Sequence, residues 1–142
     1  MAAVNVQGAN LTAALAGAGA LAAPFWGGKL RATFDTYDAT AGLDAGSTIA
    51  LSKIPAGAVV LGGILWAPTD SDATLSVGIS GSATKYMAAT AAASGALAGP
   101  YWFGVTGGIG TQLANDETII VTVGSATYSG GVIKLMMLYV VE

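Results

Sequence analysis

The stretch Ser47–Ala67, STIALSKIPAGAVVLGGILWA, decides the fold of this chain. In its first part, Ser47–Lys53, the apolar Ile49 and Leu51 alternate with polar neighbours, which is the two-residue period of a strand. Ile54-Pro55-Ala56-Gly57 follows, with Pro and Gly placed as a tight turn requires: Pro fixes φ, and Gly permits a positive one. The segment therefore predicts a strand that ends in a turn.

The second part of this stretch, Ala58–Ala67, is almost wholly apolar. A strand of this composition is expected to be covered on both faces. Its Gly62-Gly63 pair predicts a bulge or a close backbone approach. Ser47–Ala67 thus predicts two consecutive strands joined by a turn.

Outward from this stretch, short strand-like segments recur along the chain. In Lys29–Tyr37, Leu30 and Phe34 alternate with polar residues, which predicts a half-buried strand. Further strands are predicted over Thr74–Ser80, Thr84–Met87, Pro100–Val105, Glu117–Gly124 and Val132–Val141. In Pro100–Val105 one aromatic side chain should point opposite to its neighbours. Ala88–Ala98 is rich in small residues and fits either a loop or a helical turn.

About eight short strands separated by Gly, Pro, Asn and Asp turns indicate an all-β chain. No amphipathic helix long enough for a βαβ crossover lies between them, so the expected fold is an antiparallel β-sandwich. We expect a two-sheet jelly roll rather than an immunoglobulin-like sandwich, because the chain has no Cys and so no Cys-Trp-Cys core. Residues 29–142 are predicted to form this domain, preceded by an Ala/Gly-rich N-terminal arm, residues 1–28.

The N-terminal arm contains an apolar run, Leu11–Ala23, but no Lys or Arg precedes Lys29. Such a run lacks the basic flank of a secretion signal and falls short of the ~20 residues that span a bilayer. We therefore predict neither a signal nor a membrane contact. The arm is expected to lie against a neighbouring chain; the alternative is a short helix packed on its own domain, with its leucines on one face.

Composition excludes most chemistry and points to assembly. The chain has 142 residues with no His and no Cys, is 54% hydrophobic, and is only 9% charged, against roughly 25% in soluble domains. Because so little charge is available to cover a monomer, an obligate homo-oligomer or a component of a larger shell is expected. The net charge of −3 and the dispersed Lys and Arg argue against direct nucleic-acid binding. The lack of Cys fits maturation in a reducing cytoplasm.

Acidic residues offer weak candidates for chemistry. Asp70 and Asp72, or the group Asp35, Asp38 and Asp44, could supply oxygen ligands for Ca²⁺, although solvated turn residues explain them better. Asp116-Glu117 resembles the carboxylate pair of a glycosidase, but adjacent strand residues point to opposite faces. The Gly107–Gly110 run lacks the Lys-Ser/Thr of a phosphate loop. We predict no catalytic, cofactor or metal site.

Aromatic residues are the stronger candidates for a site. Tyr101-Trp102-Phe103, with Trp26 or Trp66, could form a sugar-stacking platform, but such residues more often fill a core or an oligomer interface. The predicted interface residues are Leu11, Leu15, Leu21, Phe25, Trp26, Trp66, Tyr101, Trp102 and Phe103.

The succession DAGSTIALSKIPAGAVVLGGILW, TLSVGIS, TKYMAA, GPYWFGV and ETIIVTVG resembles the capsid decoration, cement or head-accessory proteins of tailed bacteriophages. The resemblance covers roughly Lys29–Val141 and involves turn and core signatures without any catalytic residue. It implies a jelly roll, made in the host cytoplasm, that binds the capsid exterior of the virion, commonly as a trimer that clamps neighbouring major capsid protein subunits. No functional residue is carried over from it.

The composition and the resemblance together predict a non-enzymatic virion structural protein that acts as a homotrimer. Two other classes stay open. A tail or neck subunit would share the fold and composition. A carbohydrate-binding jelly roll for receptor recognition would need amide or acid partners beside the aromatics, and Asn and Gln are scarce here.

Overall fold

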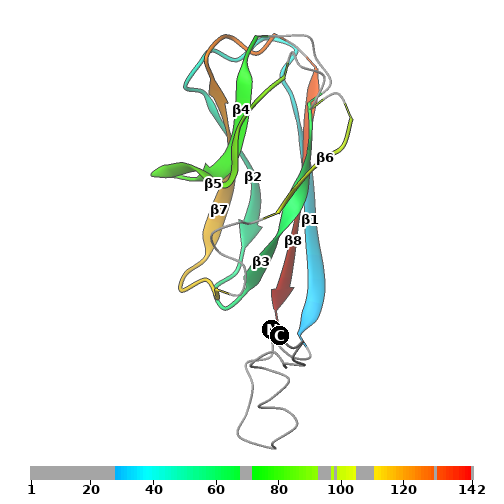
Figure 1. Cartoon of the computed structure of the whole chain (residues 1–142), viewed down its shortest axis with the longest axis vertical. Helices are drawn as coiled ribbons and strands as arrows, with labels where there is room; N and C mark the ends of the chain where they lie inside the picture. Colours follow the sequence, from blue (N-terminus) through cyan, green and yellow to red (C-terminus); the bar gives the residue numbers. More distant parts are fainter. Residues whose placement is uncertain are drawn as a thin grey trace, which may run out of the picture.

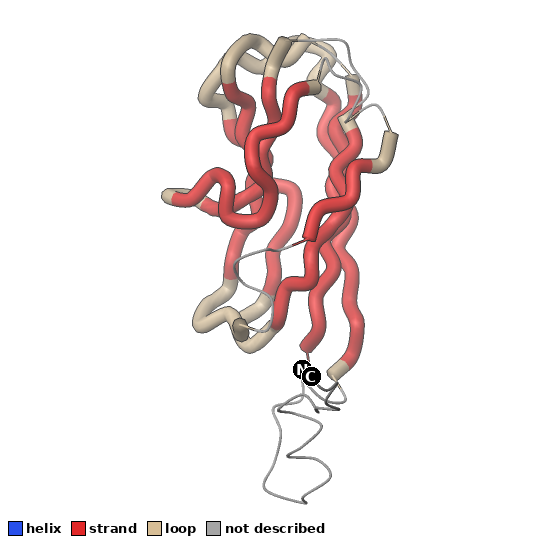
Figure 2. The backbone as a smooth tube through the Cα atoms, viewed as in Figure 1, coloured by secondary structure: helices blue, strands red, loops and turns tan. Residues whose placement is uncertain are grey.

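Two four-stranded antiparallel sheets face each other in the computed structural model of the chain (Figure 1). The structure describes residues 28–67, 72–92, 97, 99–104, 111–129 and 131–141. The strands are β1 Lys29–Asp38, β2 Thr48–Ile54, β3 Val59–Trp66, β4 Thr74–Ile79, β5 Ser82–Ala91, β6 Tyr101–Gly104, β7 Glu117–Gly124 and β8 Val132–Val141. Strands and loops account for all of the described residues, as Figure 2 shows, and none of these residues is helical.

The strand order is that of a jelly roll. One sheet runs β1-β8-β3-β6 and the other β2-β7-β4-β5. The first strand therefore pairs with the last and the second with the seventh, so the chain folds as a long double hairpin wrapped across two sheets. The prediction of an all-β, eight-stranded antiparallel sandwich is confirmed.

The core lies between the two sheets and consists of the inward side chains of alternating strand positions. In β2, Ile49, Leu51 and Ile54 are buried, and β7 contributes Ile119, Val121 and Val123 in the same way. The opposite sheet supplies Leu65, Ile133, Leu135 and Met137, all of them essentially inaccessible to solvent. Burying each such side chain contributes roughly 1.5–3 kcal/mol, so this alternation fixes which face of each strand turns inward.

The Ile54–Gly57 turn carries the chain from one sheet to the other. Gly57 has a φ of +80°, and the Ala58 amide donates to the Pro55 carbonyl over 3.3 Å. Asp116 holds the turn from outside, because its Oδ1 accepts from the Ala56 amide at 3.0 Å and its Oδ2 lies 3.1 Å from Lys53 Nζ. These bonds to the charged form lower the pKa of the Asp116 carboxyl, the Ala56 amide having the larger effect.

The glycine pair in β3 marks a bulge, as its sequence predicts. The pairing of β3 with β8 shifts register between Val60 and Gly62, and Gly62 has a φ of +144°. A Cβ on Gly62 would lie 2.2 Å from the Phe103 carbonyl oxygen, and one on Gly63 would lie 2.3 Å from that of Met136. Both neighbouring strands therefore approach β3 too closely for any side chain at these positions.

The β4–β5 hairpin is longer than the sequence suggests and projects from the sandwich (Figure 1). β5 continues to Ala91, so the start of the small-residue stretch Ala88–Ala98 is strand and not a loop or helical turn. Backbone pairing with β4 decides this, since Ala itself has little preference for a strand.

Residues 1–27 of the N-terminal arm lie outside the described residues, and the division into an arm and a domain stays a prediction. The described ranges contain no helix with the length and hydropathy that crossing a bilayer demands.

Candidate interaction surface

Strand β1 presents its apolar side chains to the outside of the sandwich. Leu30 and Phe34 are 64% and 61% exposed, although they form the apolar side of the strand. The alternate residues Arg31 and Asp35 pair with inward-facing positions of β8, at the open edge between the sheets. The prediction of a half-buried strand is therefore wrong for the single chain: the apolar side faces solvent, because Phe34 pairs with the outward-facing Met136 of β8 and β1 lies at the sheet edge.

On the outer side of the sheet, one row of large apolar side chains crosses all four strands. Phe34 of β1 pairs with Met136 of β8, Met136 pairs with Ile64 of β3, and Ile64 pairs with Trp102 of β6. Residues paired in this way project from the same face of a sheet, about 5 Å apart. Trp102, at the end of the row, is 66% exposed.

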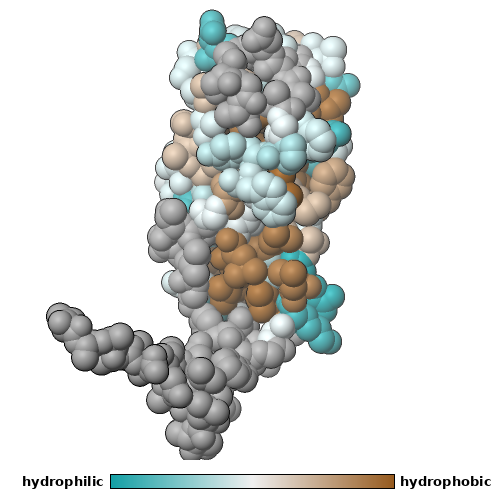
Figure 3. Space-filling model, turned by 45° about the vertical axis from the view of Figure 1, so that its right-hand side comes forward, coloured by the Kyte–Doolittle hydropathy of each residue, from teal (hydrophilic) through white to brown (hydrophobic). Residues whose placement is uncertain are grey.

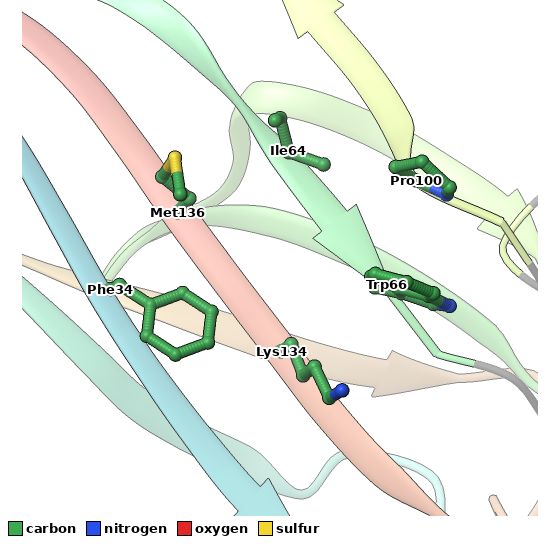
Figure 4. Close-up of a pocket in the computed structure, with 6 residues that line it drawn as sticks. All are labelled: Phe34, Ile64, Trp66, Pro100, Lys134 and Met136. Atoms are coloured by element: carbon green, nitrogen blue, oxygen red, sulfur yellow. The ribbon is translucent and has the colours of Figure 1, made fainter.

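A hollow of about 220 Å³ lies beside this row, lined by Phe34, Ile64, Trp66, Pro100, Lys134 and Met136. Figure 4 shows Lys134 on β8 between Phe34 on β1 and Trp66 on β3. The Lys134 ammonium lies 4.8 Å from the centroid of the Trp66 ring, a cation–π contact. Among the described lining residues Lys134 carries the one charge, so its alkyl stem adds to the apolar wall while its ammonium stays at the rim.

A second hollow of about 290 Å³ adjoins the other side of the row. It is lined by Leu61, Gly62, Gly63, Trp102, Phe103, Gly104 and Leu138. Gly62 pairs with Leu138 on one side and with Gly104 on the other, so the sheet surface sinks where two neighbouring strands lack a side chain. Leu61, the extra residue of the bulge, is 40% exposed at its margin.

We call this surface the apolar face and define it by Leu30, Phe34, Leu61, Ile64, Trp66, Trp102, Met136 and Leu138. Figure 3 shows hydrophobic residues gathered in one patch on the side of the molecule that this view brings forward. β3 and β8, the two central strands, carry apolar residues on both faces, and among the described residues the second sheet covers only their inner faces. Sheets exposed to water alternate apolar with polar residues, so this pattern belongs to a sheet covered on both sides.

The structure separates the predicted interface residues into three groups. Trp66 and Trp102 belong to the apolar face. Phe103 is buried in the core and Tyr101 packs partly against it, so Trp102 is the aromatic that points opposite to its neighbours. Leu11, Leu15, Leu21, Phe25 and Trp26 lie outside the described residues.

Sequence reasoning missed the β1 and β8 members of the apolar face. Leu30, Phe34, Met136 and Leu138 were not among the predicted interface residues, because a period of two residues does not tell which side of a strand meets the other sheet. A signal was present in Val132–Val141, whose apolar residues occupy both alternating sets.

The carboxylates hold the fold together through separate partners. Asp116 binds the β2–β3 turn, whereas Glu117 accepts from the Tyr86 hydroxyl and pairs with Lys85. Burial, and then the neighbouring Glu117, raise the pKa of Tyr86 well above its ordinary value. This arrangement is that of a structural ion pair over an aromatic ring, with Lys85 Nζ 5.3 Å from the Tyr86 centroid.

Three of the aspartates considered as calcium ligands accept hydrogen bonds from threonines. Asp35 accepts from the Thr36 amide at 2.8 Å, Asp38 from Thr40, and Asp44 from the Thr127 hydroxyl at 3.0 Å. Asp70 and Gly107–Gly110 lie outside the described residues. Within the ranges the structure describes, no three acidic side chains come together as a cation site.

Comparisons with known proteins find the fold in solved phage structures. A chain of "Cyanophage Pam1 capsid asymmetric unit" superposes with a TM-score of 0.67 and 21% identity, covering 82% of this chain and 88% of that one. A chain of "Capsid of Ralstonia phage GP4" gives a TM-score of 0.64 and 21% identity over 81% and 86% of the two chains. No protein-family model and no curated protein matches the chain. At this identity the similarity establishes a shared jelly-roll fold.

Proposed function

We propose that the chain is a non-enzymatic structural protein of a phage virion. In this proposal it binds the outer surface of the capsid as a homotrimer and stabilises contacts between major capsid protein subunits. The solved structures of similar fold are phage capsid assemblies, which supports a place in the virion. The charged fraction of 9% supports a chain that covers much of its surface in an assembly.

The observation that carries this proposal is the apolar face. Its exposed Phe34 and Trp102 lie at opposite ends of one row that spans the sheet. Large aromatic side chains that become buried in a protein–protein contact often carry much of its energy, and truncating such a residue costs about 2 kcal/mol or more of binding free energy. A protein that clamps a repeating lattice needs a contact surface of this kind, not a catalytic cleft.

The test is the rebinding of purified protein to capsids that lack it. We expect Phe34→Ala to weaken binding about 30-fold, which corresponds to about 2 kcal/mol. Tyr37→Ala is the matched control, since Tyr37 is also aromatic, is 41% exposed and lies on the same strand, but pairs with Ile133 on the inner side of the sheet. Its affinity should stay within about twofold of the parent chain.

Light scattering on the same preparation measures the oligomer, for which a trimer is expected. Equal losses in Phe34→Ala and Tyr37→Ala would contradict a contact through the apolar face. Failure of the parent chain to bind capsids would overturn the capsid proposal, and binding to isolated tails instead would place the chain in the tail or neck.

Sugar binding finds less support at this surface. Trp66 and Trp102 are exposed aromatics of the kind that stack on sugar rings. The described residues that line the two hollows nevertheless include no Asn, Gln, Asp or Glu side chain, which a sugar-binding groove uses to hold hydroxyl groups.

A further inference from the structure

The apolar face needs a cover without charge, and the chain itself contains such a segment. The N-terminal arm, residues 1–28, has no Asp, Glu, Lys or Arg. From Leu11 onward its large apolar side chains are Leu11, Leu15, Leu21 and the adjacent pair Phe25-Trp26, and most of the residues between them are Ala and Gly. Large apolar side chains spaced by small residues suit a face with two separate hollows, because each hollow can take a large side chain. The Ala and Gly residues between them let the backbone lie close to the sheet.

The arm joins the sandwich at the margin of the apolar face. β1 begins at Lys29, and the next residue, Leu30, is already a member of that face. Residues 1–27 would span roughly 90 Å if fully extended, whereas a ten-residue strand such as β1 spans about 34 Å. The arm is therefore long enough to cross the sheet or to leave its own sandwich and reach another.

Composition favours another copy over the arm's own sandwich. A single layer of chain laid on its own sheet would turn its other side to water, and that side would also be without charge. The apolar area exposed to water would then belong to the arm instead of the sheet, and it would not decrease. An arm held between its donor and a second copy has both sides covered, which accounts for the lack of charge along its whole length.

We propose that the N-terminal arm of one copy docks on the apolar face of a second copy, with large apolar side chains of Leu11–Trp26 in the two hollows. Each copy then gives one arm and receives one, and such a head-to-tail exchange gives a closed ring when the rotation between copies closes, as the proposed trimer requires. This inference deepens the proposed function and rests on it for the existence of a homo-oligomer. It assigns the apolar face to the contact between copies, so the loss of capsid binding expected for Phe34→Ala would come from a weakened oligomer, which is the form that binds the capsid.

Cross-linking in solution tests the exchange, because the chain has no Cys and every introduced thiol is unique. A tagged chain with Leu21→Cys and an untagged chain with Thr36→Cys are co-expressed and treated with a short bis-maleimide. Thr36 is exposed and pairs with Lys134 beside the first hollow. The control partner is Thr84→Cys, exposed on β5 of the other sheet. We expect at least tenfold more tagged–untagged dimer with Thr36→Cys than with the control.

Three outcomes would overturn the exchange: equal cross-linking to both positions, no cross-linking to either, or cross-linking only within one chain that carries both Leu21→Cys and Thr36→Cys. The last would mean that the arm covers its own sandwich. Ala20→Cys replaces Leu21→Cys if that variant fails to give the circular dichroism of the parent. The cross-linking experiment contains no capsid. A positive cross-link together with failed capsid binding would therefore contradict the proposed function alone, and a trimer without the cross-link would contradict the arm exchange alone.

Discussion

Trp102 and Phe103 are adjacent aromatic residues whose roles are opposite. Trp102 projects into solvent from β6, whereas Phe103 is 8% exposed and packs in the core. We expect Phe103→Ala to lower the free energy of unfolding by about 3–5 kcal/mol and Trp102→Ala to change it by less than about 1 kcal/mol. Urea unfolding of the separate variants measures this difference. A large loss in Trp102→Ala would mean that its ring supports the fold.

Tyr86 makes the stability of the fold depend on alkaline pH. Its hydroxyl donates to Glu117, and burial raises the pKa of this phenol. The unfolded chain releases this proton near pH 10, and the folded chain releases it only at higher pH. The contribution of Tyr86 to the free energy of unfolding is therefore complete below pH 10 and declines as the pH rises above it. Tyr86→Phe should therefore lose about 1–2 kcal/mol of stability at pH 8 and show a smaller decline up to pH 11.

The measurement is the free energy of unfolding in urea at pH 8 and at pH 11. Tyr128→Phe is the comparison, because burial also raises the pKa of Tyr128 but no partner of its hydroxyl is found among the described residues. The Tyr128→Phe variant should lose less stability at alkaline pH than the parent chain does, and it should not lose stability at pH 8. An unchanged pH dependence in Tyr86→Phe would refute the raised pKa of Tyr86, and an unchanged stability at pH 8 would refute the contribution of the Glu117 bond.

At the scale of elements, β3 is built around its glycine pair. A Cβ at Gly63 would meet the Met136 carbonyl oxygen at 2.3 Å, which belongs to the backbone of β8 and cannot turn aside. Gly63→Ala should destabilise the fold by about 3 kcal/mol through displacement of the two central strands. Gly104→Ala is the matched control in β6, where a Cβ would meet nothing within 4 Å, and its stability should stay within about 1 kcal/mol of the parent. Thermal unfolding of both variants checks this, and similar losses would contradict it.

The strands differ in how far the sequence predicts them. Glu117–Gly124 and Val132–Val141 appear with the predicted bounds, because β-branched and large apolar residues occupy the whole length between turn residues. β5 exceeds its predicted range, since its Ala-rich end is strand only through pairing with β4. The apolar side of β1 was predicted, but not its exposure, which depends on the position of this strand at the sheet edge.

At the scale of the whole molecule, the apolar face predicts how the assembly responds to salt. None of its defining residues is charged, and Lys134 in the adjoining hollow already lies over Trp66. Hydrophobic contacts are not screened by salt, whereas contacts between exposed charges weaken strongly as the Debye length falls from about 10 Å at 0.1 M to about 3 Å at 1 M. Capsid rebinding should therefore stay within about threefold between these two concentrations of NaCl. Sedimentation of capsids with bound protein measures it, and release at 1 M would indicate a contact based on charge.

The place of β8 in its sheet determines when the outer surface of that sheet forms during folding. This strand lies eighth in chain order and separates β1 from β3, so the four-stranded sheet is complete only when Val132–Val141 has paired with both. Pairing between strands far apart in sequence is slow compared with local contacts, so completion of this sheet is expected to be a late step of folding. The apolar face takes two of its residues, Met136 and Leu138, from β8, so this surface also forms late, after the core strands have paired.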